Sequence, residues 1–190
     1  MATVIDRKYI FYHIPKTGGT SVNNFLRKKN KCHTEYKFGD KSSNLLGKTH
    51  CSPLNFGDHS FENSFTIVRH PLSWYESVYK STAGRNKWYF GSAYDRKTFE
   101  SFIEQVFKIH PFGFVTCLFS LYVPYCKHVI KLENIDKEIN RLFISWGYEN
   151  IGQIEHLNQS KRPKLDTQIS ESLKKKILVI ESPMINYLGY

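Results

Sequence analysis

Apolar residues in this chain form short runs, separated by longer stretches in which they recur at helical spacing. Three of the runs are rich in β-branched and aromatic residues and have the length of buried strands, at residues 9–14, 64–69 and 127–132. Pro15 directly follows the first run, and Pro71 lies two positions after the second. We therefore expect three buried strands, the first two of them followed by a proline.

A helix is predicted after each of these strands. Val22, Phe25 and Leu26 fall on one face of the first helix, which would begin with an N-cap at Thr20 or Ser21 and has lysines at its far end. The other predicted helices carry similar apolar stripes, and they start at Pro71 or lie around residues 99–107, 135–146 and 167–180.

Strands that alternate with helices predict an α/β fold with a mostly parallel central sheet flanked by helices on both faces. The chain has 190 residues, of which 41% are hydrophobic, so we expect a single domain that spans residues 1–190. Residues 31–43 and 83–97 are polar and predict loops, whereas residues 45–51 are ambiguous. Ligands of such a sheet bind at the carboxyl ends of its strands.

The charge of the chain narrows the class of partner. Twenty-seven Lys and Arg against seventeen Asp and Glu give a net charge of +10, which attracts anions. Nucleic acid, an anionic membrane surface, a nucleotide and an acidic glycan all fit that charge. The first eight residues resemble neither a signal peptide nor a membrane span, and no stretch has the length to cross a bilayer, so we expect a cytoplasmic protein.

The cysteines are scattered along the chain without the spacing of a zinc site. They are Cys32, Cys51, Cys117 and Cys126. We expect free thiols and no metal ion.

The segment between the first strand and the first helix has the composition of an oxyanion site. It reads Pro15-Lys16-Thr17-Gly18-Gly19-Thr20-Ser21. Two glycines let the backbone approach a ligand closely, and N–H groups at a helix start point toward negative charge. Lys16 supplies a positive charge, and the hydroxyls of Thr17, Thr20 and Ser21 can donate to phosphate or sulfate oxygens. The lysine precedes the glycines, so the segment does not match the Walker A loop of ATP-binding proteins.

This loop resembles that of the sulfotransferases that use 3′-phosphoadenosine 5′-phosphosulfate (PAPS), particularly the branch that modifies carbohydrates. The similar stretch runs from His13 to Ser21. The resemblance implies a P-loop-like three-layer domain in which the loop residues Lys16 to Ser21 bind the 5′-phosphosulfate. It also implies that PAPS is the cofactor and 3′-phosphoadenosine 5′-phosphate (PAP) its product. His13 itself is expected to pack beneath the loop.

The second strand-to-helix junction is similar to the 3′-phosphate motif of the same family. Arg69, Pro71, Ser77 and Tyr79 match its pattern. An arginine at a strand end and a serine about two turns into the next helix can both reach one phosphate. The resemblance therefore assigns Arg69 and Ser77 to the 3′-phosphate of the cofactor.

Other parts of the chain match the family less closely. Many members carry a second Arg where this chain has Trp74, and Asp or Asn where it has His70. Residues 129–134 are similar to a late strand of the family and residues 157–160 to its cofactor-covering loop. Residues 187–190 are similar to its closing segment, without the acidic residue that usually lies a few positions earlier.

Transfer to a hydroxyl requires a base, because the acceptor must lose its proton as it attacks sulfur. His50 lies between the two junctions, in the stretch where the glycan-modifying relatives present a histidine, and it is the preferred candidate. His59, in the same region, and His70, beside the phosphate motif, are its rivals. Glu133 and Glu62 are alternatives, as carboxylates act in some branches of the family.

The two junctions together predict a sulfotransferase that moves a sulfuryl group from PAPS to a hydroxyl by in-line displacement. Lys16 would neutralise charge on the departing 5′-phosphate, and His50 would accept the proton. The resemblance favours a carbohydrate acceptor, with a tyrosyl residue, a lipid headgroup and a small alcohol left open, and no specific nucleic acid is expected. Two alternatives remain: a nucleotide-dependent kinase of related fold, and a non-catalytic module that binds an anionic glycan.

Overall fold

The computed structural model describes residues 2–29, 32–36, 52–55, 61–82, 98–150, 152–154 and 166–190. The chain divides into two compact units, each assembled from two separate stretches of sequence. The first unit comprises Met1–Arg69 and Leu121–Ser160, and the second comprises His70–Ser120 and Lys161–Tyr190. The second motif is divided between the units, because the boundary falls directly after Arg69, which lies in the same stretch as the first motif.

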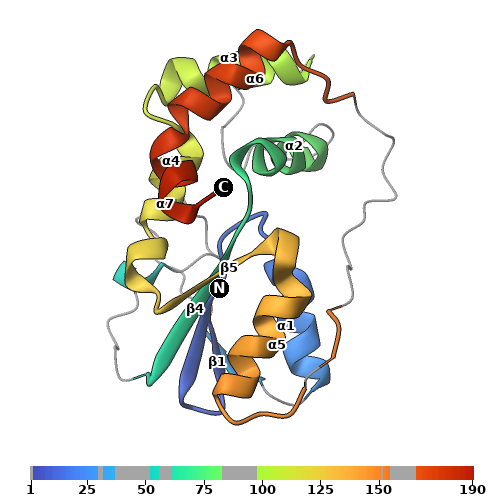
Figure 1. The fold of residues 1–190 in the computed structure, drawn as a ribbon, viewed down its shortest axis with the longest axis vertical. Coiled ribbons are helices and arrows are strands. Elements are labelled where there is room, and N and C mark those ends of the chain that lie inside the picture. The colour runs from blue at the N-terminus through green and yellow to red at the C-terminus, as the bar shows by residue number, and fades with distance from the viewer. Residues whose placement is uncertain are drawn as a thin grey trace. The chain divides into compact units, whose positions relative to one another are not determined.

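In its described residues, the first unit contains a five-stranded sheet and two α-helices, α1 and α5 (Figure 1). The strands lie in the order β3-β1-β2-β4-β5. They are β1 (Ala2–Ile5), β2 (Tyr9–Tyr12), β3 (Cys32–Tyr36), β4 (Asn63–Val68) and β5 (His128–Lys131). The helices are α1 (Gly19–Lys28) and α5 (Ile135–Ser145), with the short 3₁₀ helices η1 (Pro53–Asn55), η2 (Val123–Tyr125) and η3 (Leu132–Asn134).

The sheet is mixed, so the prediction of a mostly parallel sheet was wrong. β2, β4 and β5 are parallel, whereas β1 is antiparallel to both β2 and β3. Asp6 and Arg7 have positive φ, 47° and 58°, and the Lys8 amide donates to the Ile5 carbonyl at 3.0 Å across them. A turn of this conformation joins two antiparallel strands. β1 and β3 lie where the sequence predicted no strand, and they supply the antiparallel part of the sheet.

Helices α1 and α5 pack on one face of this sheet (Figure 1). Their apolar stripes share one buried cluster with alternate strand residues. Its members include Val22, Phe25 and Leu26 of α1, Ile139 and Phe143 of α5, and Phe11, Phe65 and Ile67 of the strands. A buried hydrogen bond of 2.8 Å from the Thr3 hydroxyl to the Asn23 side-chain oxygen fixes α1 to β1. The start of α1 is therefore held firmly beside the end of β2.

The second unit is helical in its described residues. Its helices are α2 (Pro71–Thr82), α3 (Phe99–Ile109), α4 (Phe114–Ser120), α6 (Glu171–Ile180) and α7 (Ser182–Leu188). Glu181, between α6 and α7, is fully buried. Its carboxylate accepts hydrogen bonds from the Tyr75 hydroxyl, from the Thr116 amide at 2.7 Å and hydroxyl at 2.6 Å, and from the Val115 amide at 3.2 Å. These donors stabilise the buried carboxylate and tie α2 and α4 to the junction of α6 and α7.

The α/β class is confirmed, together with the three predicted strands. The five predicted helices are also present, although the last begins at Glu171 after an N-cap at Ser170, later than expected. Helices α4 and α7 were not predicted, and the ambiguous residues 45–51 and the predicted loop at residues 83–97 lie outside the described residues. Within the described part of the chain, no single helix is long and apolar enough to cross a bilayer, although the bent pair of segments Phe99–Ile109 and Phe114–Tyr125 together has the necessary length and apolar composition.

Two of the four cysteines have described side chains, and both are free thiols. Burial raises the pKa of the Cys126 thiol to about 12. Burial also raises the pKa of the Cys117 thiol, and the charge of Glu181 adds to this shift. Both thiols are therefore protonated near neutral pH.

Candidate functional site

The first motif and Arg69 lie at the same edge of the sheet in the first unit. β2 and β4 are adjacent and parallel, with Tyr12 opposite Thr66, so the segments that follow them leave the sheet on the same side. The Thr66 hydroxyl donates to the Tyr12 carbonyl at 2.8 Å and holds the two strand ends together. Arg69 directly follows β4, and the loop that begins at Pro15 follows β2. Cationic groups from both segments therefore belong to one edge.

The loop backbone is left-handed at two positions, Lys16 with φ of 65° and Gly18 with φ of 84°. Glycine adopts this conformation freely, whereas lysine pays about 1–2 kcal/mol for it. Strained residues of this kind cluster at ligand-binding sites. Thr17 lies between them, fully buried, and its hydroxyl donates to the Ile14 carbonyl at 2.8 Å. The Thr17 hydroxyl proton is thus used inside the loop, although the sequence assigned it to the ligand.

Neighbouring side chains occupy the space that a Cβ would need at the two glycine positions. A Cβ on Gly19 would lie 1.9 Å from His13 Cδ2, because the imidazole covers the first residue of α1. A Cβ on Gly18 would lie 2.7 Å from Cδ1 of Leu132, the residue that directly follows β5. His13 therefore packs against the loop, as the sequence predicted, and Leu132 contacts the loop from the first residue of η3.

The start of α1 is electrostatically suited to an anion. Gly18 is its N-cap and has no side chain to cap the helix, and no acidic residue lies in the first turn. Arg27 and Lys28 occupy the last turn, where cations complement the helix dipole. Thr20 is exposed, whereas Ser21 is buried. N–H groups at such a helix start bind phosphate or sulfate oxygens.

Ser77 and Tyr79 of the second motif lie on α2, in the second unit. Ser77 is half-buried, while Tyr79 is buried against the rings of Phe99 and Phe102 and serves the core. Trp74, at the position where the resemblance led us to expect an arginine, is fully buried. Its place in the core of this unit explains why a charged side chain is absent there.

His70 and the C-terminal residue meet within the second unit. The rings of His70 and Tyr190 are 5.2 Å apart at 85° to one another. This contact ties the end of the chain to the residue that follows Arg69. The sequence did not predict this contact.

The structure separates two of the candidate bases. Glu133 is exposed in η3, directly beyond the carboxyl end of β5, and so lies at the edge of the loop. Glu62 precedes β4, at the opposite end of that strand, where its carboxylate lies 3.9 Å from the Lys8 amine on the surface. Glu62 is therefore not brought to the loop. His50 and His59 lie outside the described residues, as do residues 157–160.

Leu132 is the site residue that sequence reasoning missed in the first unit. It was predicted only as the last residue of a strand. An apolar residue directly beyond the carboxyl end of a parallel strand is the signal that could have identified it, because that position adjoins the loops of neighbouring strands.

Within the described residues, no group of three or more His, Cys, Asp or Glu side chains is placed to hold a metal ion. No protein-family model matches the chain, and no curated protein matches it.

Proposed function

We propose that this protein is a sulfotransferase that transfers a sulfuryl group from PAPS to a hydroxyl group. The observation that carries the proposal is the loop between β2 and α1, in which Lys16 precedes a glycine pair at the helix start and the N-cap, Gly18, has no side chain to cap the helix. Arg69 supports it from the same edge of the sheet. The P-loop-like three-layer arrangement of this family is part of the same proposal.

The residues of the loop fit the phosphosulfate group of this cofactor. Gly18 is the N-cap of α1 and has no side chain, so it supplies no acceptor for the backbone N–H groups of the helix start, which suit ligand oxygens. No carboxylate in the first turn of α1 opposes the negative charge. When bound, PAPS would supply a sulfuryl group already attached to a phosphate leaving group.

Each loop residue has a distinct part in the proposed transfer. Lys16 stabilises the negative charge that grows on the 5′-phosphate as the sulfuryl group leaves. The amides of Gly18 and Gly19 and the hydroxyls of Thr20 and Ser21 hold the phosphosulfate oxygens. Thr17 contributes through its hydrogen bond to Ile14, which fixes the turn between Lys16 and Gly18.

Arg69 and Ser77 recognise the 3′-phosphate in this proposal. A guanidinium and a hydroxyl can both donate to phosphate oxygens, and together they distinguish a 3′-phosphorylated nucleotide from AMP. His50 is the base that accepts the proton of the acceptor hydroxyl, with Glu133, His59 and His70 as the alternatives. A carbohydrate is the favoured acceptor.

The proposal is tested by incubating the protein with PAPS and a panel of neutral and acidic oligosaccharides. PAP is quantified by chromatography, and the oligosaccharides are weighed by mass spectrometry for a gained sulfuryl group. Parallel reactions contain ATP in place of PAPS. Release of PAP with a sulfated product is expected. Consumption of ATP with a phosphorylated product would instead support a kinase, and oligosaccharide binding without release of either product would support a non-catalytic module.

A further inference from the structure

The turn between α3 and α4, at residues 110–113, exposes large apolar side chains. Phe112 is 82% exposed, and Ile109, the last residue of α3, is 54% exposed. Pro111, between them, is exposed as well. A single exposed apolar residue is common on protein surfaces, but three within four positions form a local apolar surface that favours a partner. We call these three residues the apolar tip.

The turn that carries the apolar tip is fixed by contacts within the second unit. The His110 amide donates to the Val106 carbonyl at 2.8 Å, and the Gly113 amide donates to the His110 carbonyl at 3.1 Å. The rings of His110 and Phe114 have centroids 5.0 Å apart. Gly113 has a φ of 86°, and the Glu181 carboxylate fills the space that a Cβ would need there. The exposure of the tip is therefore a property of a packed turn and not of a frayed helix end.

The helices on either side of the turn face the core of the second unit. Phe102 and Phe107 of α3 are buried, as are Val115 and Leu118 of α4. The apolar composition of these two helices therefore serves the core. A turn that presents apolar side chains outward while its helices stay packed is suited to attachment at a membrane surface, not to insertion across the bilayer.

The charge nearest to the apolar tip is positive. Lys108 is exposed directly before Ile109, whereas Glu104, the next exposed charge toward the start of α3, lies about one turn farther from the tip. Burial lowers the pKa of His110, so this imidazole is neutral at pH 7. The net charge of +10 of the whole chain adds a longer-range attraction to anionic surfaces.

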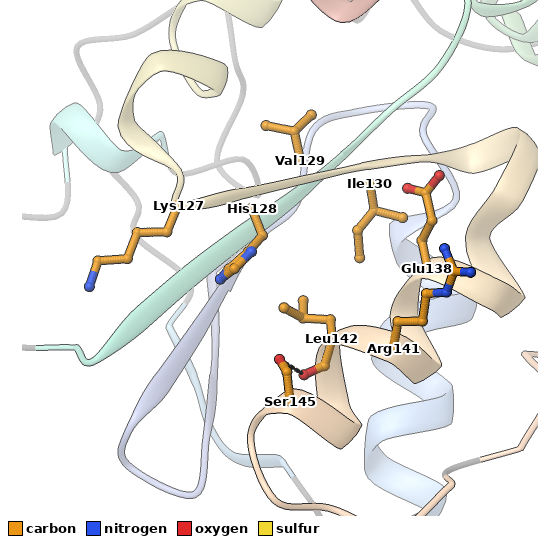
Figure 2. Close-up of a pocket in the computed structure, with 8 residues that line it drawn as sticks. All are labelled: Lys127, His128, Val129, Ile130, Glu138, Arg141, Leu142 and Ser145. Atoms are coloured by element: carbon orange, nitrogen blue, oxygen red, sulfur yellow. Dashed lines mark hydrogen bonds between the residues drawn. The ribbon is translucent and has the colours of Figure 1, made fainter.

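The cleft of about 430 Å³ between β5 and α5, in the first unit, lacks this preference for negative charge. Arg141 and Glu138 project from α5 beside it and carry opposite charges (Figure 2). The Lys127 amine donates to the Glu62 carbonyl. The apolar tip, by contrast, combines apolar surface with positive charge.

A membrane fits the shape of the apolar tip better than a protein partner does. A protruding aromatic ring needs a matching pocket on a protein, whereas the boundary between lipid headgroups and acyl chains accepts it without a preformed surface. Pairing of two copies through the tip would bring the two Lys108 side chains together, which is electrostatically unfavourable. Anionic headgroups instead complement Lys108.

We propose that the apolar tip attaches this protein to an anionic membrane surface. Phe112 and Ile109 would enter the boundary between headgroups and acyl chains, and Lys108 would lie among the anionic headgroups. This inference is independent of the proposed sulfuryl transfer, because it uses none of the residues assigned to PAPS.

The test is co-sedimentation of the full chain with lipid vesicles. One set of vesicles contains phosphatidylcholine alone, and the other contains phosphatidylcholine with phosphatidylserine. We expect binding to the anionic vesicles, weaker binding to phosphatidylcholine alone, and a loss of affinity as salt screens the headgroups.

Two pairs of variants locate the binding. Phe112→Ser should weaken it about tenfold to a hundredfold, the scale of one large apolar side chain that is no longer buried. Tyr187→Ser removes an aromatic ring that is 68% exposed on α7, and it should leave the affinity unchanged. Lys108→Glu should weaken the binding about tenfold, whereas Lys137→Glu, at an exposed position of α5, should have a far smaller effect. Thermal melting of all four variants establishes that the fold is intact.

Several outcomes overturn the proposal. They are equal effects of Phe112→Ser and Tyr187→Ser, equal binding to the two sets of vesicles, and no binding up to about 10 mM lipid. Self-association that Phe112→Ser abolishes, measured by sedimentation equilibrium in the absence of vesicle binding, assigns the apolar tip to a second copy of the chain instead.

Discussion

The imidazole of His13 covers Gly19 so closely that a Cβ on Gly19 would lie 1.9 Å from His13 Cδ2. The residue that directly follows β2 and the first residue of α1 are therefore in direct contact, and the His13 side chain limits which residue can stand at the start of the candidate anion site. Because Gly19 does not have positive φ, the obstacle to a larger residue there is steric alone.

Gly19→Ala should therefore lower the thermal stability of the protein and its affinity for PAP, and the added substitution His13→Ala should restore much of both. The reason is that the smaller residue removes the atoms with which the new methyl group collides. Thr20→Ala, at the adjacent exposed position, is the control for stability and should melt close to the wild type. If the double variant melts no higher than Gly19→Ala alone, the contact between His13 and residue 19 is not the cause of the lost stability.

Gly18→Ala should behave differently, because two effects oppose it. Its φ of 84° costs a residue with a Cβ about 1–2 kcal/mol, in addition to the contact with Leu132. Leu132→Ala relieves only the contact, so the double variant should remain less stable than Leu132→Ala by about that amount. Urea unfolding measures the four free energies, and full additivity of the two substitutions would contradict the coupling.

The stability of the protein should decrease with rising pH above about 10, in part because of Tyr75. Burial raises the pKa of Tyr75 well above the ordinary value of 10.0, and the charge of Glu181 and the hydrogen bond to it raise it further. The folded protein holds this proton more tightly than the unfolded chain does. The contribution to the free energy of unfolding is therefore complete below pH 10 and is lost as the pH rises toward the folded pKa.

Tyr75→Phe should make the decrease in the free energy of unfolding above pH 10 less steep. It should also lower the free energy of unfolding at pH 7 by about 1–2 kcal/mol, because Glu181 loses one donor. Urea unfolding between pH 7 and 11 measures both effects, with Tyr187→Phe, at an exposed position of α7, as the control. A variant whose profile parallels that of the wild type would show that Tyr75 does not contribute.

Lys16→Ala should damage turnover of PAPS far more than affinity for PAP. The lysine contact strengthens as charge develops on the leaving phosphate, and removal of one such group costs about 10²–10³ in kcat. PAP release under saturating PAPS measures turnover, and calorimetry measures the affinity. An unchanged kcat with only a raised KM would show that Lys16 binds the cofactor without assisting the transfer.

The parts of the fold that follow from local pattern could be predicted from the sequence. β2, β4 and β5 are rich in β-branched and aromatic residues, and α1, α2 and α5 have clear apolar stripes, so these elements were found. β1 was missed because its antiparallel pairing depends on a turn with left-handed Asp6 and Arg7, which neither residue type requires. Helix α4 is only seven residues long, and its N-terminal amides are satisfied from a distant part of the chain by Glu181.

In the candidate site, too, the features that local sequence determines could be predicted, and those that depend on distant contacts could not. Its loop was identified because glycine, lysine and hydroxyl residues occur together within seven positions. The contact of Leu132 with Gly18 was not predicted, because the two residues are 114 positions apart and no local sequence pattern indicates the contact. The use of the Thr17 hydroxyl within the loop likewise depends on the turn geometry, which residue types alone do not determine.

Arg69→Ala should weaken PAP binding by about 2–3 kcal/mol, a factor of roughly thirty to a hundred, the scale of a charge-assisted hydrogen bond. Affinity for AMP should change little, since AMP lacks the 3′-phosphate. Calorimetric titration of both nucleotides into the variant measures this difference. Equal losses for PAP and AMP would place Arg69 outside the 3′-phosphate site.

The central claim is tested most directly by calorimetric titration of the wild-type protein with PAP, AMP and ATP, because this requires no knowledge of the acceptor. We predict that PAP binds more tightly than AMP by roughly thirtyfold to a hundredfold, and more tightly than ATP as well. Equal affinity for the three nucleotides, or a preference for ATP, would contradict the assignment of the β2–α1 loop and Arg69 to PAPS.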